Sequence, residues 1–318
     1  MANSDFLKKL INAHYDNDQV MFRSAILQIA AAESSAGHSN LANELKNLAN
    51  KSPSTLKFII DDDIDSLCNV SFPNTDENQI IVSDDIKLHL ERIMKEYRER
   101  NKLRGYGMQN RSKILLEGDP GTGKTLTASV LAGELQLPLF QIQMDKLITK
   151  FMGETSAKLR KIFEQIRLNR GIYLFDEFDA IGADRTLDNE VGEMRRILNT
   201  FLKFMEEDNS DSLILCATNN KKMLDQALFR RFDDVLKYSL PTEEEIKKLI
   251  KLQLGIYYDP SYVTQSILKM AIGLSHAEIS KACNDCIKAV ILDDIKLSAS
   301  LLSQFIGERV DTYKVKGA

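Results

Sequence analysis

The chain has 318 residues, 43% of them hydrophobic and 28% charged, which suits about two globular domains of ordinary soluble composition. Its net charge of −4 argues against a protein that coats duplex nucleic acid, because such proteins carry a basic domain or stripe, so nucleic acid is not expected as a partner. No apolar run approaches the roughly 18 residues of a membrane span and no signal-peptide pattern opens the chain, which predicts a cytoplasmic protein without a membrane partner.

Three helical patterns occupy the first fifty residues. Apolar side chains recur at helical spacing over 6–11, 22–29 and 41–48, with turn-forming residues between them. We interpret residues 1–52 as a small helical module that binds a partner or substrate, and residues 53–78 as an acidic linker. The aspartates between 61 and 65 have a carboxylate metal site as their alternative interpretation.

Residues 79–240 alternate between short apolar runs and helical patterns. The runs at 113–116, 139–142, 172–175, 213–217 and 235–238 predict five buried strands, and the helices between them predict a parallel sheet covered on both faces. Residues 241–318 show helical patterns alone, with capping residues at Thr242 and Ser275. The predicted fold class is α/β: a five-stranded parallel sheet flanked by helices, an all-helical C-terminal lid and the small N-terminal module.

The last of these regions also contains a CxxC pair, Cys283 and Cys286. A zinc or redox site would need further ligands, and none is visible nearby in the sequence. The apolar helical pattern around the pair favours core packing.

A phosphate-binding loop follows the first predicted strand of the large region. GDPGTGKT, residues 118–125, matches G-x-x-x-x-G-K-[ST] at every fixed position and precedes a helix. Backbone N–H groups at a helix N-terminus suit phosphate oxygens, Lys124 suits the β- and γ-phosphates, and the Thr125 hydroxyl suits Mg²⁺. A glycine-rich turn that binds nothing is disfavoured by the order strand, loop, helix. The sequence therefore predicts a P-loop NTPase.

Polar residues follow two further predicted strands. Asp176 and Glu177 come directly after 172–175, at the carboxyl edge where open α/β sheets bind ligands. Asp176 is predicted to hold Mg²⁺ and Glu177 to orient or deprotonate the attacking water, with a simple acidic loop as the alternative. Asn219 ends another strand, where its amide can hold the same water against the γ-phosphate.

Together these motifs resemble the AAA group of AAA+ ATPases over roughly residues 80–318. GDPGTGKT is similar to the Walker A motif, LFDEFDAIG to Walker B, CATNN to the sensor 1 strand and LDQALFRRFDDVLKYSLP to the second region of homology. The resemblance implies ATP hydrolysis with ATP and Mg²⁺ as cofactors, and residues 79–240 and 241–318 as the large ATPase domain and its lid. It places Arg230 and Arg231 where arginine fingers act on a neighbouring subunit's nucleotide. Relatives often separate the two arginines with Pro or Gly, so which one reaches the phosphate stays open, and a surface ion-pair network is the alternative.

The resemblance implies two further sets of site residues. Ser275–His276–Ala277 stands where relatives often carry Ser-Gly-Ala, beside the ribose or base. Phe151, Met152 and Gly153 stand where an aromatic, apolar, Gly triplet lines a hexamer pore and grips an extended polypeptide; core packing of Phe151 is the alternative. The implied nucleotide-binding set is Gly118, Asp119, Pro120, Gly121, Thr122, Gly123, Lys124, Thr125, Leu126, His276 and Ala277.

Our leading hypothesis is ATP-driven remodelling, unfolding or threading of a protein substrate by a homo-oligomeric ring, a hexamer by resemblance. The chain also resembles small bacterial or phage-borne AAA ATPases, some of which are encoded beside a subtilisin-like serine protease in phage-defence loci, which implies such a protease as partner. A DNA-acting loader or motor and a nucleotide-gated scaffold are the alternatives. The acidic composition disfavours the first, and Glu177 disfavours the second.

Overall fold

The computed structural model describes residues 8–11, 19–49, 67–148, 152–181, 188–219 and 229–314. These residues belong to two compact units, 1–58 and 59–318. In the first unit, helices α2 (Gln19–Ser35) and α3 (Ser39–Ala49) pack on each other and bury small side chains such as Ala30 and Ala42. Both helices include the patterns expected at 22–29 and 41–48, whereas only residues 8–11 of the first pattern are described, and they are helical.

The second unit is built on a six-stranded sheet in the order β1–β3–β4–β5–β2–β6. Its strands are β1 (Cys68–Ser71), β2 (Lys113–Gly118), β3 (Leu139–Ile142), β4 (Ile172–Phe175), β5 (Leu213–Thr218) and β6 (Asp234–Tyr238). The five predicted strands are present and parallel. The sheet has one strand more than predicted, because β1 joins its edge antiparallel to β3.

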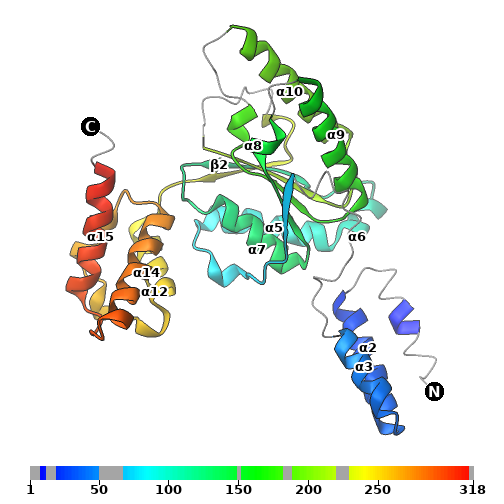
Figure 1. Cartoon of the computed structure of the whole chain (residues 1–318), viewed down its shortest axis with the longest axis horizontal. Coiled ribbons are helices and arrows are strands. Elements are labelled where there is room, and N and C mark those ends of the chain that lie inside the picture. The colour runs from blue at the N-terminus through cyan, green and yellow to red at the C-terminus, as the bar shows by residue number, and fades with distance from the viewer. Residues whose placement is uncertain are drawn as a thin grey trace. The chain divides into compact units, whose positions relative to one another are not determined.

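Helices cover both faces of this sheet (Figure 1). Helices α5 (Asp84–Arg98) and α7 (Lys124–Leu135) bury their apolar sides with the strands in one core. On the other face, Phe163 of α9 (Met152–Leu168) and Phe175 of β4 pack edge-on against Phe201 of α10 (Asp188–Glu207), with ring centroids 5.5 and 4.9 Å away. Short helices α6 (Arg100–Gly105) and α8 (Met144–Leu147) complete this domain.

The segment between β1 and α5 crosses the helix that follows the phosphate loop. Thr75 donates its hydroxyl to the carbonyl of Ser129 on α7 at 2.9 Å, just before the short helix η2 (Glu77–Gln79). A Cβ on Gly133 would lie 2.0 Å from the Thr75 carbonyl oxygen, so only glycine allows this close approach. This crossing and β1 occupy part of the stretch interpreted as a linker, whereas its aspartates at 61–65 lie outside the described residues.

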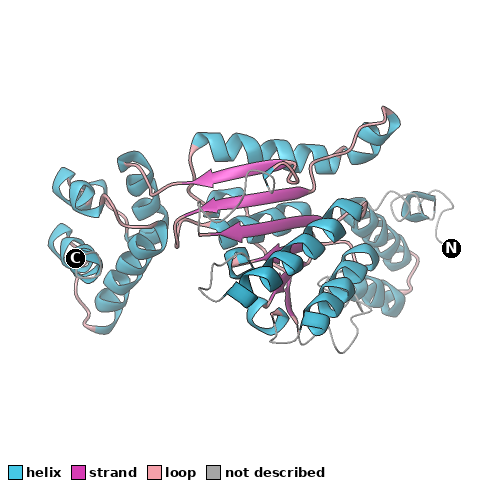
Figure 2. Ribbon diagram, turned by 90° about the horizontal axis from the view of Figure 1, so that it is seen from above, coloured by secondary structure: helices cyan, strands magenta, loops and turns pink. Residues whose placement is uncertain are grey.

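The C-terminal helices form a lid with its own core. It consists of α12 (Glu243–Leu254), α13 (Gln265–Ala271), α14 (His276–Leu292) and α15 (Ala299–Lys314), with the short helices η4 (Gly255–Tyr257) and η5 (Pro260–Tyr262). The predicted caps are present: the Thr242 side chain caps α12 in a full capping box, and Ser275 caps α14. In Figure 2 the parallel strands point toward these helices, so the carboxyl edge of the sheet faces the lid.

The CxxC cysteines lie inside the lid core. Cys283 and Cys286 are fully buried, and burial raises the pKa of the two thiols to about 12 and about 11. A thiol with so high a pKa is a poor nucleophile and metal ligand, which confirms the prediction of core packing. Within the described part of the chain, no helix combines the length and apolar character needed to span a bilayer.

Candidate nucleotide-binding site

The phosphate loop joins β2 to α7 in a conformation that depends on its glycines. Gly121 and Gly123 have φ angles of 74° and 105°, in the left-handed region that glycine adopts without strain. A Cβ on Gly118 would lie 2.5 Å from the carbonyl oxygen of Tyr238 on β6. The spacing of glycines in the motif is therefore required by the backbone path and by the neighbouring strand.

Lys124 connects the loop to the end of another strand. Its ammonium donates to the carbonyl oxygens of Gly118 and Asp119 at 2.8 and 2.9 Å, and to Oδ1 of Asn219 after β5 at 2.8 Å. Burial lowers the pKa of Lys124, while the carboxylates of Asp176 and other nearby acids oppose this shift. The lysine thus brings a positive charge to the point where the phosphate loop meets β5.

The two predicted metal ligands lie within hydrogen-bond distance of each other. The Thr125 hydroxyl donates to Oδ2 of Asp176, which follows β4, at 2.8 Å. A hydroxyl and a carboxylate oxygen side by side match the oxygen ligands that Mg²⁺ takes in nucleotide sites. These two residues would hold a magnesium ion, which would supply positive charge beside bound phosphates.

Glu177 has an unusual backbone for its residue type. Its φ angle is 53°, its side chain is exposed, and its N–H donates to Oδ1 of Asp176 at 3.0 Å. A left-handed conformation is rare for residues other than glycine and costs about 1–2 kcal/mol, so it persists only where the surrounding structure holds it. The turn therefore separates two adjacent carboxylates into different positions.

The sequence analysis missed Asp179, which supports the asparagine. It lies in the short helix η3 (Phe178–Ile181), and its Oδ1 accepts the backbone N–H of Asn219 at 3.3 Å. This carboxylate links the ends of β4 and β5. Its only signal in the sequence is its place three residues after Asp176, in the stretch LFDEFDAIG.

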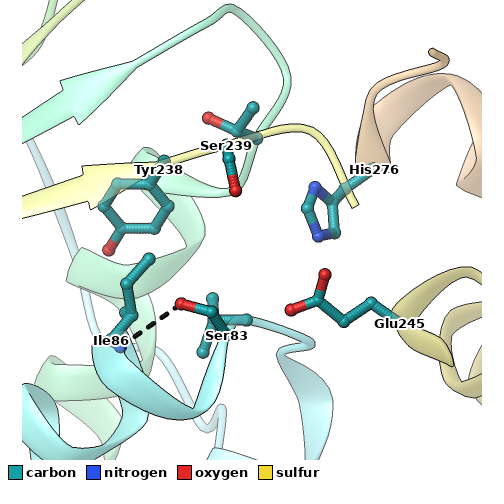
Figure 3. A pocket seen from close by; sticks show the side chains of 8 residues that line it. Ser83, Ile86, Tyr238, Ser239, Glu245 and His276 are labelled. Carbon is teal, nitrogen blue, oxygen red and sulfur yellow. Dashed lines mark hydrogen bonds between the residues drawn. The ribbon is translucent and has the colours of Figure 1, made fainter. Parts of the chain in front are cut away.

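The lid contacts the phosphate loop directly. The backbone N–H of Ala277 at the start of α14 donates to the carbonyl oxygen of Gly121 at 2.9 Å. Beside this contact is a pocket with His276 and Glu245 on the lid side (Figure 3). The opposite wall belongs to the sheet domain, and the full lining is Val82, Ser83, Ile86, Thr122, Tyr238, Ser239, Glu245 and His276. Thr122 belongs to the phosphate loop, so the pocket adjoins it.

His276 has unsatisfied polar atoms in this pocket. Neither ring nitrogen has a hydrogen-bond partner among the residues that the structure describes, although both atoms are buried. Burial lowers the pKa of His276, and the nearby carboxylate of Glu245 opposes the shift. The ring is therefore neutral near pH 7 and has one donor and one acceptor free for a ligand.

The two predicted arginines lie at the other edge of the sheet. Arg230 and Arg231 lie before β6, separated from its first residue by Phe232 and Asp233, and it is the far end of β6, at Tyr238, that pairs with Gly118 of the phosphate loop. Four strand residues at about 3.3 Å each span roughly 13 Å. The structure therefore does not bring these arginines together with Lys124, Asp176, Glu177 and Asn219.

The predicted pore residues are described only in part. Phe151 lies outside the described residues, and Met152 and Gly153 begin α9, with only their backbone described.

Known proteins share sequence with this chain. The family model "ATPase family associated with various cellular activities (AAA)" matches residues 114–240, from Ile114 in β2 to Leu240. An uncharacterized AAA family ATPase, y4kL, of Sinorhizobium fredii is 33% identical over 306 residues, which cover 92% of this chain and 91% of the relative. The chain belongs to the AAA family of ATPases. Membership of this family supports ATP binding and hydrolysis by the loop described above.

Other relatives match a smaller share of the chain. A putative 26S proteasome regulatory subunit homolog of Methanothermobacter marburgensis is 28% identical over 208 residues, 64% of this AAA ATPase and 55% of the relative. The ATP-dependent zinc metalloprotease FtsH of Mycoplasmopsis synoviae is 34% identical over 194 residues, 58% of this chain and 29% of the relative. This AAA ATPase thus spans about half of the first protein and less than a third of the second.

Proposed function

We propose that this AAA ATPase couples Mg²⁺-dependent ATP hydrolysis to remodelling, unfolding or threading of a protein substrate in a homo-oligomeric ring, a hexamer. The observation that carries the enzymatic part is the convergence of three strand ends on the phosphate loop. Lys124 binds Asn219 at 2.8 Å, and Thr125 binds Asp176 at 2.8 Å. Parallel strands end at one edge of a sheet, so residues far apart in the sequence meet where phosphates bind.

Each residue has a role in this proposal. Lys124 and the loop N–H groups bind the β- and γ-phosphates. Thr125 and Asp176 would hold Mg²⁺, which would neutralise negative charge on the phosphate oxygens. Glu177 orients or deprotonates the attacking water, and Asn219 positions that water. These roles require no movement of the sheet, because all five residues lie at its carboxyl edge.

The nucleotide's base and ribose are proposed to lie on the lid side of the loop. His276 and Ala277 begin α14 there, and Ala277 already contacts Gly121. The free donor and acceptor of the His276 ring suit a polar edge of the ligand. A nucleotide bound there touches the sheet domain and the lid together, so its binding stabilises their contact.

A protein substrate is favoured by the names of two groups of relatives. One is a putative 26S proteasome regulatory subunit homolog and the other an ATP-dependent zinc metalloprotease, and they match 64% and 58% of this chain. Phe151, Met152 and Gly153 are proposed to contact the substrate in the ring's pore. Residues 1–52 are proposed to select the partner, which by resemblance is a subtilisin-like serine protease in antiviral defence.

A ring is favoured by the position of the arginines. Arg230 and Arg231 precede the end of β6 remote from its own phosphate loop, so they serve a nucleotide only if it is bound by another copy. Guanidinium groups suit the charge that develops on a transferring phosphoryl group. The proposed active site is therefore completed between two subunits.

The test uses a fluorescent model protein with an unstructured tail as substrate. We expect ATP-dependent loss of its fluorescence, none with Lys124→Ala, and retained ATP hydrolysis without unfolding in Phe151→Ala. Sedimentation with ATP should show a ring. Hydrolysis that is stimulated by DNA and not by the tailed protein would contradict the protein substrate, and a monomer that hydrolyses ATP would contradict the ring.

A further inference from the structure

We propose that Glu245 is the residue that selects the base of the nucleotide, because its fixed carboxylate accepts a hydrogen bond that the amino group of adenine can donate and the oxygen of guanine at the same position cannot. His276 binds the neighbouring nitrogen of the same ring. The assignment rests on the proposed nucleotide site, and it adds which chemical edge of the base that site accepts.

The carboxylate of Glu245 is held in place by the start of its own helix. Its Oε2 accepts the backbone N–H of Thr242 at 2.7 Å and the Thr242 hydroxyl at 2.8 Å, within the capping box of α12. The other oxygen, Oε1, has no hydrogen bond to any residue in the described ranges. An ionised carboxylate only accepts hydrogen bonds, so Glu245 presents a fixed acceptor.

This carboxylate faces the ring of His276 across the pocket beside the phosphate loop (Figure 3). Both ring nitrogens of His276 are buried and lack a hydrogen-bond partner in the part of the chain that the structure describes. A neutral imidazole has a donor at one nitrogen and an acceptor at the other, and its tautomers exchange the two. His276 can therefore bind a donor or an acceptor, whereas Glu245 can bind only a donor.

The rest of the pocket does not distinguish one base from another. The hydroxyl of Tyr238 is paired with that of Thr127 at 2.7 Å, and Thr122 donates its hydroxyl to a backbone carbonyl of the phosphate loop at 2.7 Å. The two serine hydroxyls in the lining can both donate and accept, and Val82 and Ile86 are apolar. Selection by hydrogen bonding therefore depends on Glu245.

The two common purines differ at the position that such a carboxylate contacts. Adenine carries an amino group beside a ring nitrogen that accepts, whereas guanine carries an oxygen beside a ring N–H. Guanine would place its oxygen against the carboxylate, and neither acceptor would have a partner. A site built to bind one hydrogen-bonding group rejects an analogue that leaves its polar groups unpaired, so this contact discriminates strongly.

The decisive variant is Glu245→Gln, because glutamine also fits a capping box. Its amide oxygen can accept the two hydrogen bonds from Thr242, which leaves the amide N–H₂ as a donor in the pocket in place of the acceptor. Dissociation constants of ATP and GTP are measured by calorimetry on the full chain. The wild type should bind ATP at least about tenfold more tightly than GTP, and Glu245→Gln should bring this ratio to about one or below. An unchanged ratio in Glu245→Gln would overturn the assignment.

Glu244→Gln is the matched control. Glu244 lies in the same first turn of α12, is exposed and is not among the residues that line the pocket. The control removes the same charge from the start of the helix and should keep the wild-type ratio. A ratio that falls equally in both variants would mean that charge at the helix terminus causes the effect, and the assignment would be wrong.

His276→Gly separates the roles of the two residues. It should weaken both nucleotides by about threefold to tenfold and leave their ratio within about threefold, because a neutral imidazole can bind either purine. If the ratio changes as much as in Glu245→Gln, Glu245 is not the selecting residue.

Inosine triphosphate tests which position of the base is bound. It has an oxygen where adenine has its amino group, as guanine does, but lacks guanine's own amino group. The wild type should disfavour it as strongly as GTP, and binding as tight as that of ATP would overturn the assignment. Equal weakening of ATP and GTP in Glu245→Gln would assign the carboxylate to the shared ribose instead. A wild type that binds no nucleotide overturns the proposed function as well, whereas one that binds ATP and GTP equally overturns the assignment alone.

Discussion

The contact between the phosphate loop and the lid makes Gly121→Ala an informative change. The φ angle of 74° at this position strains any residue with a Cβ, at about 1–2 kcal/mol. The added Cβ would also lie 2.6 Å from Oγ of Ser275 and 3.0 Å from Cβ of Ala277. Both distances are shorter than ordinary van der Waals contacts, so the Ser275 hydroxyl and the start of α14 must shift away from the loop.

The size of the effect follows from the contacts that this shift disturbs. Moving α14 breaks the hydrogen bond from Ala277 to Gly121, worth about 0.5–1.5 kcal/mol net. It also disturbs the Ser275 cap, worth about 1 kcal/mol. Because the nucleotide is proposed to touch both sides of this contact, about 2 kcal/mol is lost from binding, or roughly 30-fold in the dissociation constant.

A matched control separates backbone strain from the lid contact. Gly107 has a φ angle of 72°, and a Cβ there would meet no atom within 4 Å. Both variants should lose thermal stability, but only Gly121→Ala should bind a fluorescent ADP analogue about 30-fold more weakly. Equal ADP affinity in the two variants would refute the reasoning that the lid contact contributes to the nucleotide site.

Three further predictions test single residues. Glu177→Gln should lower phosphate release by about 100-fold or more and leave ATP affinity within a few-fold, as measured by nucleotide binding. Burial lowers the pKa of His276 from 6.5, so the unfolded chain takes up a proton that the folded chain excludes, and stability falls as the pH drops below 6.5. His276→Asn should therefore lose less thermal stability than the wild type between about pH 7.5 and about pH 5.5, and an equal loss would contradict this. Gly133→Ala should destabilise by about 1–3 kcal/mol, opposite to the usual gain in a helix, because its Cβ would lie 2.0 Å from the Thr75 carbonyl.

The parallel part of the fold was predictable because its signals are local. Each of the five parallel strands contains a short stretch rich in apolar residues, and β4 and β5, which are buried along their whole length, have the longest uninterrupted ones. Strand β1, with the sequence CNVS, lies at the edge of the sheet and pairs with β3 alone. In the sequence, four residues of mixed polarity cannot be distinguished from a loop, because only the pairing with β3 makes them a strand.

The candidate site also has a part that the sequence predicts and a part that depends on packing. Asp176 and Asn219 each end a buried strand, so the sequence could place both at the edge beside Lys124, and in the structure Lys124 does bind Asn219. The left-handed backbone of Glu177 depends on how segments pack after folding, and so does the ring of His276, which has no hydrogen-bond partner in the part of the chain that the structure describes. No local pattern carries that information, and the chemical roles of these residues stay predictions.

The sheet itself supports the argument that one copy cannot complete the proposed active site. Strand β2 ends at Gly118, where the phosphate loop begins, while the neighbouring strand β6 begins just after Arg231. The two strands are parallel and in register from Ile114 with Asp234 to Gly118 with Tyr238. The phosphate loop follows the end of this pair of strands, whereas the two arginines precede its beginning. The proposed role of Arg230 and Arg231 at a phosphate therefore requires a nucleotide bound by a second copy.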